Sequence, residues 1–544
     1  MRRVFFGELY LNMQGKKHYS EKLFCNFQLS ERVPTGNFYR NLKDQIDLQF
    51  VYKATEKHYG KEGQKSIDPA VFFKLLLVGY LENINSDRKL IEFCSMRLDV
   101  LYFLDYDIDE ELPWHSTISR TRQLYGEEIF LDLFKAVLSM CISKGMVKGK
   151  RLSVDSAYIK ANASLDSLCE KEILDDVETY SEELNENSEF KIEKKEITPK
   201  DKSKTTVSKQ KQKDVDQHHN WKKVAYKNQP GHGKKAEENS DETSERTRKF
   251  LSNHTHHSPT DPDARISTKP GKPRQMNYYA QIAVDEASHV ITGAGADFAD
   301  KKDSQCLEHL LEQTIENLNE HQIELEQILA DTGYSSGESL AYLESKNIDA
   351  YIPNFGLYKP NREGFIYNKE KDQYECIRGN HAILPFKKIH HDANGYTKRE
   401  YRSDYSRCKD CPLKSTCLSK TNYKKIEDSI YRPYYDRMHE KLKTPYAKRI
   451  FKKRGSTVEP VLGSMLNYGN LKRVNTRGIE QANKHVLMAA TVYNLKKCLR
   501  FNVKKPVAKV MAKMAEKCAL KKLTLLNFMK SLLPTPNYFQ FLTR

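Results

Sequence analysis

The sequence predicts an α/β protein in which a mixed sheet is flanked by helices, with an all-helical domain before it and two insertions within it. Helical periodicity dominates residues 67–144, where apolar side chains recur every three or four positions. Strand-like and helix-like runs then alternate from residue 149 to residue 502. Two stretches of different composition, 165–252 and 355–430, interrupt this alternation and are interpreted as the insertions.

Residues 1–148 are expected to form the all-helical domain. The pair Asp68-Pro69 is typical of an N-cap followed by proline at the first helical position, and it predicts a helix that ends near Tyr80. Further helices are predicted from Ser86, after Pro113 and over 127–144.

The helix predicted after Pro113 is basic, which is typical of a helix-turn-helix arrangement that presents one helix to DNA. Arg120 and Arg122 are therefore candidate DNA-binding residues. A plain helical packing domain with solvated arginines is the alternative.

The segment 151–164 carries an acidic residue in the middle of a predicted strand. Leu152 and Val154 point to one face of this strand, whereas Ser153 and Asp155 point to the other. Aspartate is depleted in strands, and a buried carboxylate must be neutralised by a partner. A bound divalent cation is one such partner.

Two further acids occupy comparable positions. A short apolar strand ends at Asp331, after which Gly333 turns the chain. Pro460 suits the first position of a helix, so Glu459 is predicted at or near an N-cap. Taken singly, each acid is more often a solvated charge or a cap than a metal ligand. Together, three convergent carboxylates could hold two Mg²⁺ ions about 3.5–4 Å apart, the arrangement used in phosphodiester chemistry.

The remaining elements are predicted to complete the α/β domain. They are a hairpin of strands 278–284 and 289–294, a helix over 303–318, a helix over 337–346, an apolar segment 348–352 and a long helix over 479–499. The motif T-D-P-D contains Asp261 and Asp263, which either support the acidic site or form a turn.

The two insertions and the C-terminus differ in composition. Residues 165–252 are rich in charge and expected to be partly disordered, and residues 503–544 are expected to form a basic helix and a tail. Residues 355–430 contain a C-x2-C pair and two further cysteines, and four thiolates could bind a structural Zn²⁺; free buried thiols are the alternative. These cysteines are Cys376, Cys408, Cys411 and Cys417.

The overall charge favours a polyanionic partner. The 544 residues carry a formal net charge of +17, and lysine and arginine gain affinity for nucleic acid by releasing its counterions. No apolar run approaches the ~20 residues that a membrane helix needs. Eleven cysteines, an odd number in a large chain, favour a reduced compartment, so a cytoplasmic protein is expected.

The motifs VDSAYIKANAS, TDPDAR, ADTGYSSGE and VEPVLG followed by NTRG resemble, in this order, the DDE transposases of bacterial insertion sequences. The stretches IDPAVFFKLLLVGYLENINSDRKLIE and LPWHSTISRTR are similar to the helical domain that precedes the catalytic domain in this group. The resemblance covers residues 30 to 500 approximately, and it implies an RNase H-like fold for the catalytic domain.

The resemblance also implies a site and an activity. Asp155, Asp331 and Glu459 would be the catalytic triad that binds two Mg²⁺ or Mn²⁺ ions. The protein would bind the terminal inverted repeats of its own element, cleave the DNA strand, and transfer it to target DNA. Bringing two element ends together makes a homodimer, acting at the bacterial nucleoid, the default expectation.

Basic residues near the triad are candidates for DNA contact, because a strand that enters a metal site needs its phosphates neutralised. The family often has a lysine or arginine seven residues after the glutamate, where this chain has Leu466. It also commonly has aspartate before H-S-T, where this chain has Trp114. The candidate DNA-binding residues near the triad are Arg449, Lys452, Lys453, Arg454, Lys472, Arg473 and Arg477.

Three other functions remain compatible with the sequence. The first is an RNase H-like nuclease without strand transfer, and the second is a catalytically silent DNA-binding regulator derived from a transposase. The third is a zinc-stapled interaction protein, for which DNA binding would be weak and little affected by salt.

Overall fold

The computed structural model describes residues 27–60, 66–170, 252–253, 256–268, 273–354, 358, 362–392, 396–418 and 421–501. Most of the charged insertion predicted over 165–252, and the basic helix and tail predicted over 503–544, lie outside the described residues. Near the start of that insertion, η2 (Leu165–Ser167) is followed by β2 (Cys169–Glu170), which pairs with β3 (His256–His257). Among the described helices, none has the length and apolarity needed to cross a membrane.

The N-terminal part is helical, as predicted, and its helices begin at local caps. Asp68 accepts hydrogen bonds from the backbone N–H groups of Ala70 and Val71, and Pro69 occupies the first turn. The predicted helix from Ser86 is in fact two helices that are separated at Met96 and Arg97. The bounds are α2 (Leu29–Arg32), α3 (Phe38–Gln45), α4 (Phe50–Thr55), η1 (Glu56–His58), α5 (Pro69–Leu81), α6 (Asp87–Ser95), α7 (Leu98–Leu104), α8 (His115–Leu124) and α9 (Glu127–Ser143).

A mixed sheet forms the centre of the molecule. Its strand order is β4-β5-β1-β7-β8, with β6 also paired to β5. Strands β1, β5 and β6 are antiparallel neighbours, whereas β7 and β8 run parallel to β1. The bounds are β1 (Arg151–Lys160), β4 (Arg265–Ser267), β5 (Gln275–Asp285), β6 (Ile291–Phe298), β7 (Gln327–Leu329) and β8 (Asp349–Tyr351).

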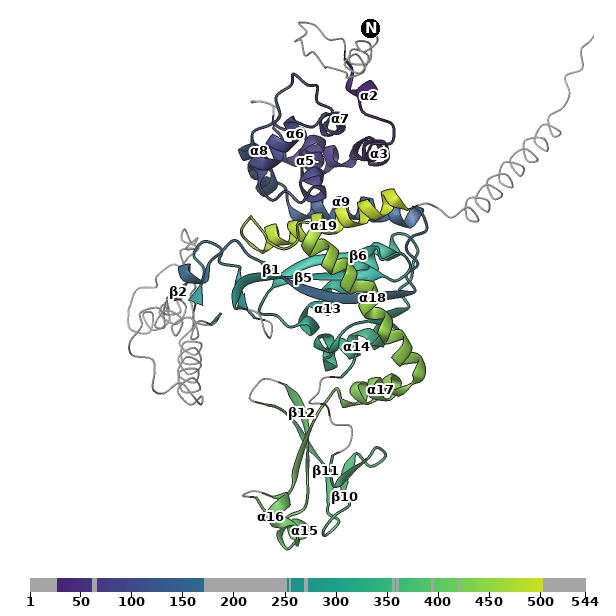
Figure 1. Cartoon of the computed structure of the whole chain (residues 1–544). Coiled ribbons are helices and arrows are strands. Elements are labelled where there is room, and N and C mark those ends of the chain that lie inside the picture. The colour runs from purple at the N-terminus through teal and green to yellow at the C-terminus, as the bar shows by residue number, and fades with distance from the viewer. Residues whose placement is uncertain are drawn as a thin grey trace, which may run out of the picture.

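Helices cover both faces of this sheet. Helices α9 and α19 (Ile479–Arg500) lie between the sheet and the N-terminal helices, and α13 (Asp303–Asn319) and α14 (Gly337–Ser345) lie on the opposite side (Figure 1). The β6 edge is covered as well, because Asn494 accepts from Ile291 N and donates to Ile291 O, and Asn317 donates to Thr292 O. The protein is therefore a mixed α/β fold with N-terminal helices.

A second, smaller sheet follows β8 and extends away from the central sheet, on the side opposite the N-terminal helices (Figure 1). Its strand order is β13-β12-β11-β10-β9, and all neighbours are antiparallel. Two short helices, α15 (Tyr405–Lys409) and α16 (Lys414–Cys417), lie at its far end. The strands are β9 (Phe365–Asn368), β10 (Gln373–Cys376), β11 (Ile383–His391), β12 (Thr397–Arg402) and β13 (Lys425–Ser429).

The chain returns to the central sheet through α17 (Arg432–Lys443) and α18 (Pro445–Tyr468). The prediction that Glu459 lies at a helix N-cap is wrong, because α18 begins fourteen residues earlier, where Thr444 accepts from Ala447 N and Pro445 occupies the first turn. Pro460 lies inside the helix, where it removes one backbone hydrogen bond. Burial of Val458, Val461 and Met465 holds the helix together across this position.

Candidate active site

Asp155 lies on β1, the strand that joins the antiparallel and parallel halves of the sheet. Across the sheet it pairs with Ile282 of β5. Its flanking residues Val154 and Ser156 are buried, and the Asp155 side chain itself is only 16% exposed. The strand therefore fixes this carboxylate in a largely water-excluded position.

Asp331 follows β7, the parallel neighbour of β1. Because Ser153 pairs with Leu329, continuing the register by two residues sets Asp331 beside Asp155. The Asp331 carboxylate accepts a hydrogen bond of 2.9 Å from Gly333 N, which orients it. A Cβ atom at Gly333 would lie 3.1 Å from this carboxylate, so the turn is built for a residue without a side chain.

Glu459 reaches the same place from α18, which packs on β1. One cation joins all three acids: the Arg454 guanidinium lies 3.0 Å from Asp155, 3.7 Å from Asp331 and 3.7 Å from Glu459. The three acids come from positions 155, 331 and 459, so only the folded chain brings them together.

The charges at this place do not balance. Three carboxylates and one guanidinium give a formal charge of −3 + 1 = −2. The Arg454 side chain is 11% exposed, and its Nε has no hydrogen-bond partner. The Asp331 and Glu459 side chains are open to solvent, at 44% and 65% exposure. An oxygen-only donor set with excess negative charge and an open side fits hard divalent cations such as Mg²⁺ or Mn²⁺.

A fourth acid, Asp303, supports this group and was not predicted from the sequence. Its carboxylate accepts hydrogen bonds from the hydroxyls of Ser156, at 2.6 Å, and Tyr279. A Cβ at Gly333 would lie 2.4 Å from its other oxygen. Burial, followed by the negative charges of Asp303 and Asp155, raises the pKa of Tyr334. The sequence indicates only that Asp303 is an acid at the start of a predicted helix. Acids are common at that position, so this feature does not identify a site residue.

Asp261 and Asp263 make hydrogen bonds to residues at the start of α19 rather than to the three acids. Asp261 accepts hydrogen bonds from the Tyr278 hydroxyl and, at 3.0 Å, from Gly478 N. Asp263 accepts one of 3.0 Å from Ile479 N. The T-D-P-D motif therefore holds the start of α19.

The basic candidates divide into exposed and paired side chains. Arg122 binds Asp87 through two hydrogen bonds, Lys453 pairs with Glu286, and Arg454 lies among the three acids. Arg473 and Arg477 line a surface cavity that also contains Lys160 and Arg274. The exposed candidates are Arg120, Arg449, Lys452, Lys472, Arg473 and Arg477.

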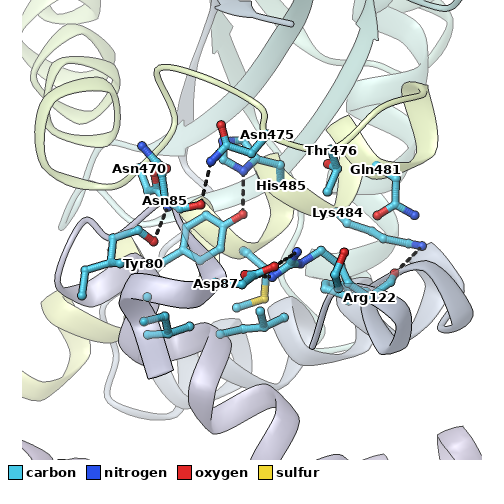
Figure 2. A pocket seen from close by; sticks show the side chains of 17 residues that line it. Tyr80, Asn85, Asp87, Arg122, Asn470, Asn475, Thr476, Gln481, Lys484 and His485 are labelled. Atoms are coloured by element: carbon cyan, nitrogen blue, oxygen red, sulfur yellow. Dashed lines mark hydrogen bonds and ion pairs between the residues drawn. The ribbon is translucent and has the colours of Figure 1, made fainter. Parts of the chain in front are cut away.

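Arg122 lines a partly open pocket where the N-terminal helices meet α19 (Figure 2). Lys484, 1% exposed, donates to Arg122 O at 3.3 Å and pairs with Glu480. His485 shares a 2.6 Å hydrogen bond with the Tyr80 hydroxyl. Burial, and then the charge of Arg122, lower the pKa of His485 to about 4. This network joins the two parts of the protein, and Arg122 contributes to that junction.

Among the described residues, one group outside the triad has ligand atoms close enough to one another to hold a metal ion. His390, Glu400 and Glu427 lie on the smaller sheet with ligand atoms within 4.8 Å of one another. Lys425 already pairs with both acids, and Arg402 binds Glu400 at 2.7 Å. The carboxylates of Glu400 and Glu427 are therefore already paired with basic side chains.

Comparison with known proteins gives two family matches. Residues 27–124 match a family model described as a Transposase domain (DUF772), and residues 375–499 match one described as a Transposase DDE domain. The first match covers helices α2 to α8, and the second contains both Arg454 and Glu459. No curated protein and no solved structure matches the chain.

Proposed function

The chain belongs to the DDE transposases of insertion sequences, and we propose that it cuts and joins DNA at the terminal inverted repeats of its own mobile element. One observation carries this proposal: Asp155, Asp331 and Glu459, more than a hundred residues apart in the chain, share a single guanidinium. In this proposal they are the catalytic triad.

The proposed catalytic fold is RNase H-like. Supporting this, the sheet joins four antiparallel strands (β1, β4, β5 and β6) to two strands that run parallel to β1, and helices cover both of its faces. In this reading the domain spans 149–502, and the smaller sheet, within 355–430, is an insertion between Asp331 and Glu459.

The three carboxylates would hold two Mg²⁺ or Mn²⁺ ions. Bound there, the ions would activate the attacking oxygen and stabilise the leaving 3′ oxygen of an in-line displacement. Asp155 is the most buried of the three carboxylates and lies on the central strand, so it would be the most firmly positioned of the three metal ligands. Asp331 and Glu459, which are more exposed, would each complete one ion's shell beside the DNA phosphate.

Arg454 has two successive roles in this proposal. Without metal its guanidinium offsets part of the repulsion among the three acids and keeps them close. Divalent cations would compete with the guanidinium for the same carboxylate oxygens. Arg454 would then be available to bind a phosphate of the DNA strand, for which its planar set of N–H donors is suited.

DNA would approach along two basic regions. Arg449 and Lys452 project from α18 on the N-terminal side of Glu459 and are exposed. The cavity containing Lys160, Arg274, Arg473 and Arg477 lies at the far end of β1 from Arg151. Such contacts position the backbone and carry no sequence information by themselves. Two element ends must be held together for transposition, so the proposed active form is a homodimer, acting on the bacterial nucleoid.

The test uses duplex DNA that carries the inverted repeats found beside the gene. In Mg²⁺ the protein should nick this DNA at the element end and form joined products with target DNA. Asp155→Asn should abolish both products while the gel shift of the repeat DNA persists. Glu440→Gln, which removes an exposed carboxylate on α17, should leave both reactions intact. Nicks without joined products would indicate a nuclease, and unchanged cutting by Asp155→Asn would reject the assignment.

A further inference from the structure

Four cysteines converge at the far end of the smaller sheet, near α15 and α16 (Figure 1). Cys376 ends β10, Cys408 lies in α15, Cys411 follows α15, and Cys417 ends α16. All four line the same small cavity. We propose that these four thiols bind one Zn²⁺ ion in a tetrahedral structural site.

The local backbone brings the two halves of this site into contact. Gly379, in the turn after Cys376, has φ +58°, a conformation that glycine adopts without strain. A Cβ atom there would lie 2.5 Å from Cys411 Sγ. Asn380 in the same turn donates a hydrogen bond of 3.1 Å to Arg407 O. The turn after Cys376 and the turn holding the C-x2-C pair are thus fitted against each other.

The cavity that the four cysteines line is small. The cavity volume is about 20 Å³, close to the volume one water molecule requires. Cys408 is buried, and the other three cysteines are partly buried. No three of the four sulfurs lie within 4.8 Å of one another in the structure, so Zn–S bonds of ~2.3 Å would require the sulfurs to move together.

This end of the sheet has little apolar core of its own. Its cluster of buried residues consists of Ala382, Cys408 and Leu418, with Cys376 and Cys417 packed against it. A cluster of this size is far smaller than those that hold a domain together, and small modules of this kind commonly depend on a metal or on disulfides. All four cysteines are free thiols, so no disulfide supplies that constraint.

Basic side chains surround the four cysteines. One Zn²⁺ with four thiolates carries a formal charge of −2. Arg407, Lys414 and Lys424 line the same cavity, and Lys424 Nζ donates a hydrogen bond of 2.9 Å to Cys417 O. These basic side chains would offset part of the negative charge of the zinc site.

Two of the thiols make hydrogen bonds in the structure. Cys376 Sγ donates to Arg378 O at 2.7 Å, and Cys408 Sγ lies 3.0 Å from Ser403 Oγ. Binding would replace these bonds: four thiols lose four protons and form four Zn–S bonds, and no electron is transferred. The sulfurs would draw to about 3.8 Å from one another, as tetrahedral Zn–S geometry requires.

The experiment measures zinc in the full-length, untagged protein purified without added metal. Elemental analysis should give about one zinc per chain. Cys411→Ser and Cys417→Ser should each lower this to a small fraction. Cys169→Ser, which removes an exposed thiol outside the cavity, should keep the full content. Replacing zinc by Co²⁺ in the unaltered protein should give the visible absorption bands of tetrahedral cobalt–thiolate coordination, a readout that does not depend on any variant folding.

Two outcomes would overturn the proposal. One is purified protein without zinc that takes up no Co²⁺ while its thiols react freely with a thiol reagent, which would identify a packed thiol cluster. The other is zinc content that persists in the cysteine variants and is lost instead in Glu427→Gln, which would assign the metal to His390, Glu400 and Glu427. Neither readout depends on DNA cleavage, so this proposal can fail while the proposed function stands.

Discussion

The Arg454 guanidinium lies 3.0 Å from the Asp155 carboxylate, with both side chains largely buried, at 11% and 16% exposure. The contact joins the middle of the central strand to α18, five residues before Glu459. It supplies a positive charge where the proposed function requires metal ions.

Replacing Arg454 should separate metal binding from DNA cleavage. Arg454→Gln removes a positive charge that competes for the three carboxylates, so Mn²⁺ should bind more tightly, on the order of tenfold. Strand cleavage should nevertheless fall, because the phosphate loses its guanidinium partner. Titration calorimetry with Mn²⁺ measures the first effect. Lys448→Gln, which removes an exposed charge from the same helix, is the matched control. Weaker Mn²⁺ binding in Arg454→Gln would show that Arg454 organises the acids more than it competes with metal.

Gly333 tests how closely the acids must approach each other. A Cβ in Gly333→Ala would lie 2.4 Å from Asp303 Oδ2 and 3.1 Å from Asp331 Oδ1, so one carboxylate must move. We expect cleavage to fall by ~100-fold. At Gly463, in α18, an added Cβ meets no atom within 4 Å, so Gly463→Ala should keep activity and raise stability by about 0.5–1 kcal/mol. Full activity in Gly333→Ala would mean that the site tolerates displaced carboxylates.

Asp303 is predicted to be a positioning residue. Asp303→Asn weakens the acceptor for the Ser156 and Tyr279 hydroxyls and loosens the strand segment that carries Asp155. Residues that orient metal ligands typically change affinity or activity by 10–100-fold, so the Mn²⁺ concentration for half-maximal cleavage should rise by about that factor. Asp300→Asn, three residues away and outside this network, is the control. A lower maximal rate at an unchanged metal requirement would contradict the assignment.

His485 makes the domain junction sensitive to acid. Its pKa is lowered from 6.5 to about 4 by burial and then by Arg122, so the folded protein holds it neutral where the unfolded chain would be protonated. The contribution of neutral His485 to the free energy of unfolding is therefore fully present above pH 6.5, and it is lost as the pH falls toward 4. Between pH 7.5 and pH 5 the loss should be about 2 kcal/mol.

Urea unfolding at both pH values measures this effect. His485→Gln, which cannot be protonated, should lose about 2 kcal/mol less than the unaltered protein over the same interval. The exposed His309→Gln should behave as the unaltered protein does. The pocket also holds Tyr80, Arg122 and Lys484, of which arginine and lysine keep their charge over this interval. Identical pH dependence in the two histidine variants would contradict the prediction.

Local signals were sufficient for most elements. The cap Asp68-Pro69 begins a helix, and the alternation around Asp155 is a strand, because both depend on neighbouring residues. The rule that proline marks the first turn of a helix gave a wrong helix start at Glu459. Two X-Pro pairs, Thr444-Pro445 and Glu459-Pro460, carry the same local signal, and only tertiary packing determines which one starts the helix.

The partners of charged residues could not be predicted in this way. Arg122 was expected to be a DNA-binding residue. In the structure its guanidinium instead pairs with Asp87, which lies on another helix, and nothing local in the sequence indicates that pairing. Arg454 was placed near Glu459 by sequence, but its contacts with Asp155 and Asp331 depend on the register of β1 and β7. The predicted domain limits and the roles of the three acids stay predictions.

Locating bound metal directly is the strongest test of the central claim. Crystals soaked in Mn²⁺ and measured at an energy where manganese scatters anomalously would reveal each ion's position. We predict anomalous density in contact with carboxylate oxygens of Asp155, Asp331 and Glu459, with the Arg454 guanidinium displaced from them. Manganese bound elsewhere, with Arg454 still between the three acids, would contradict the account.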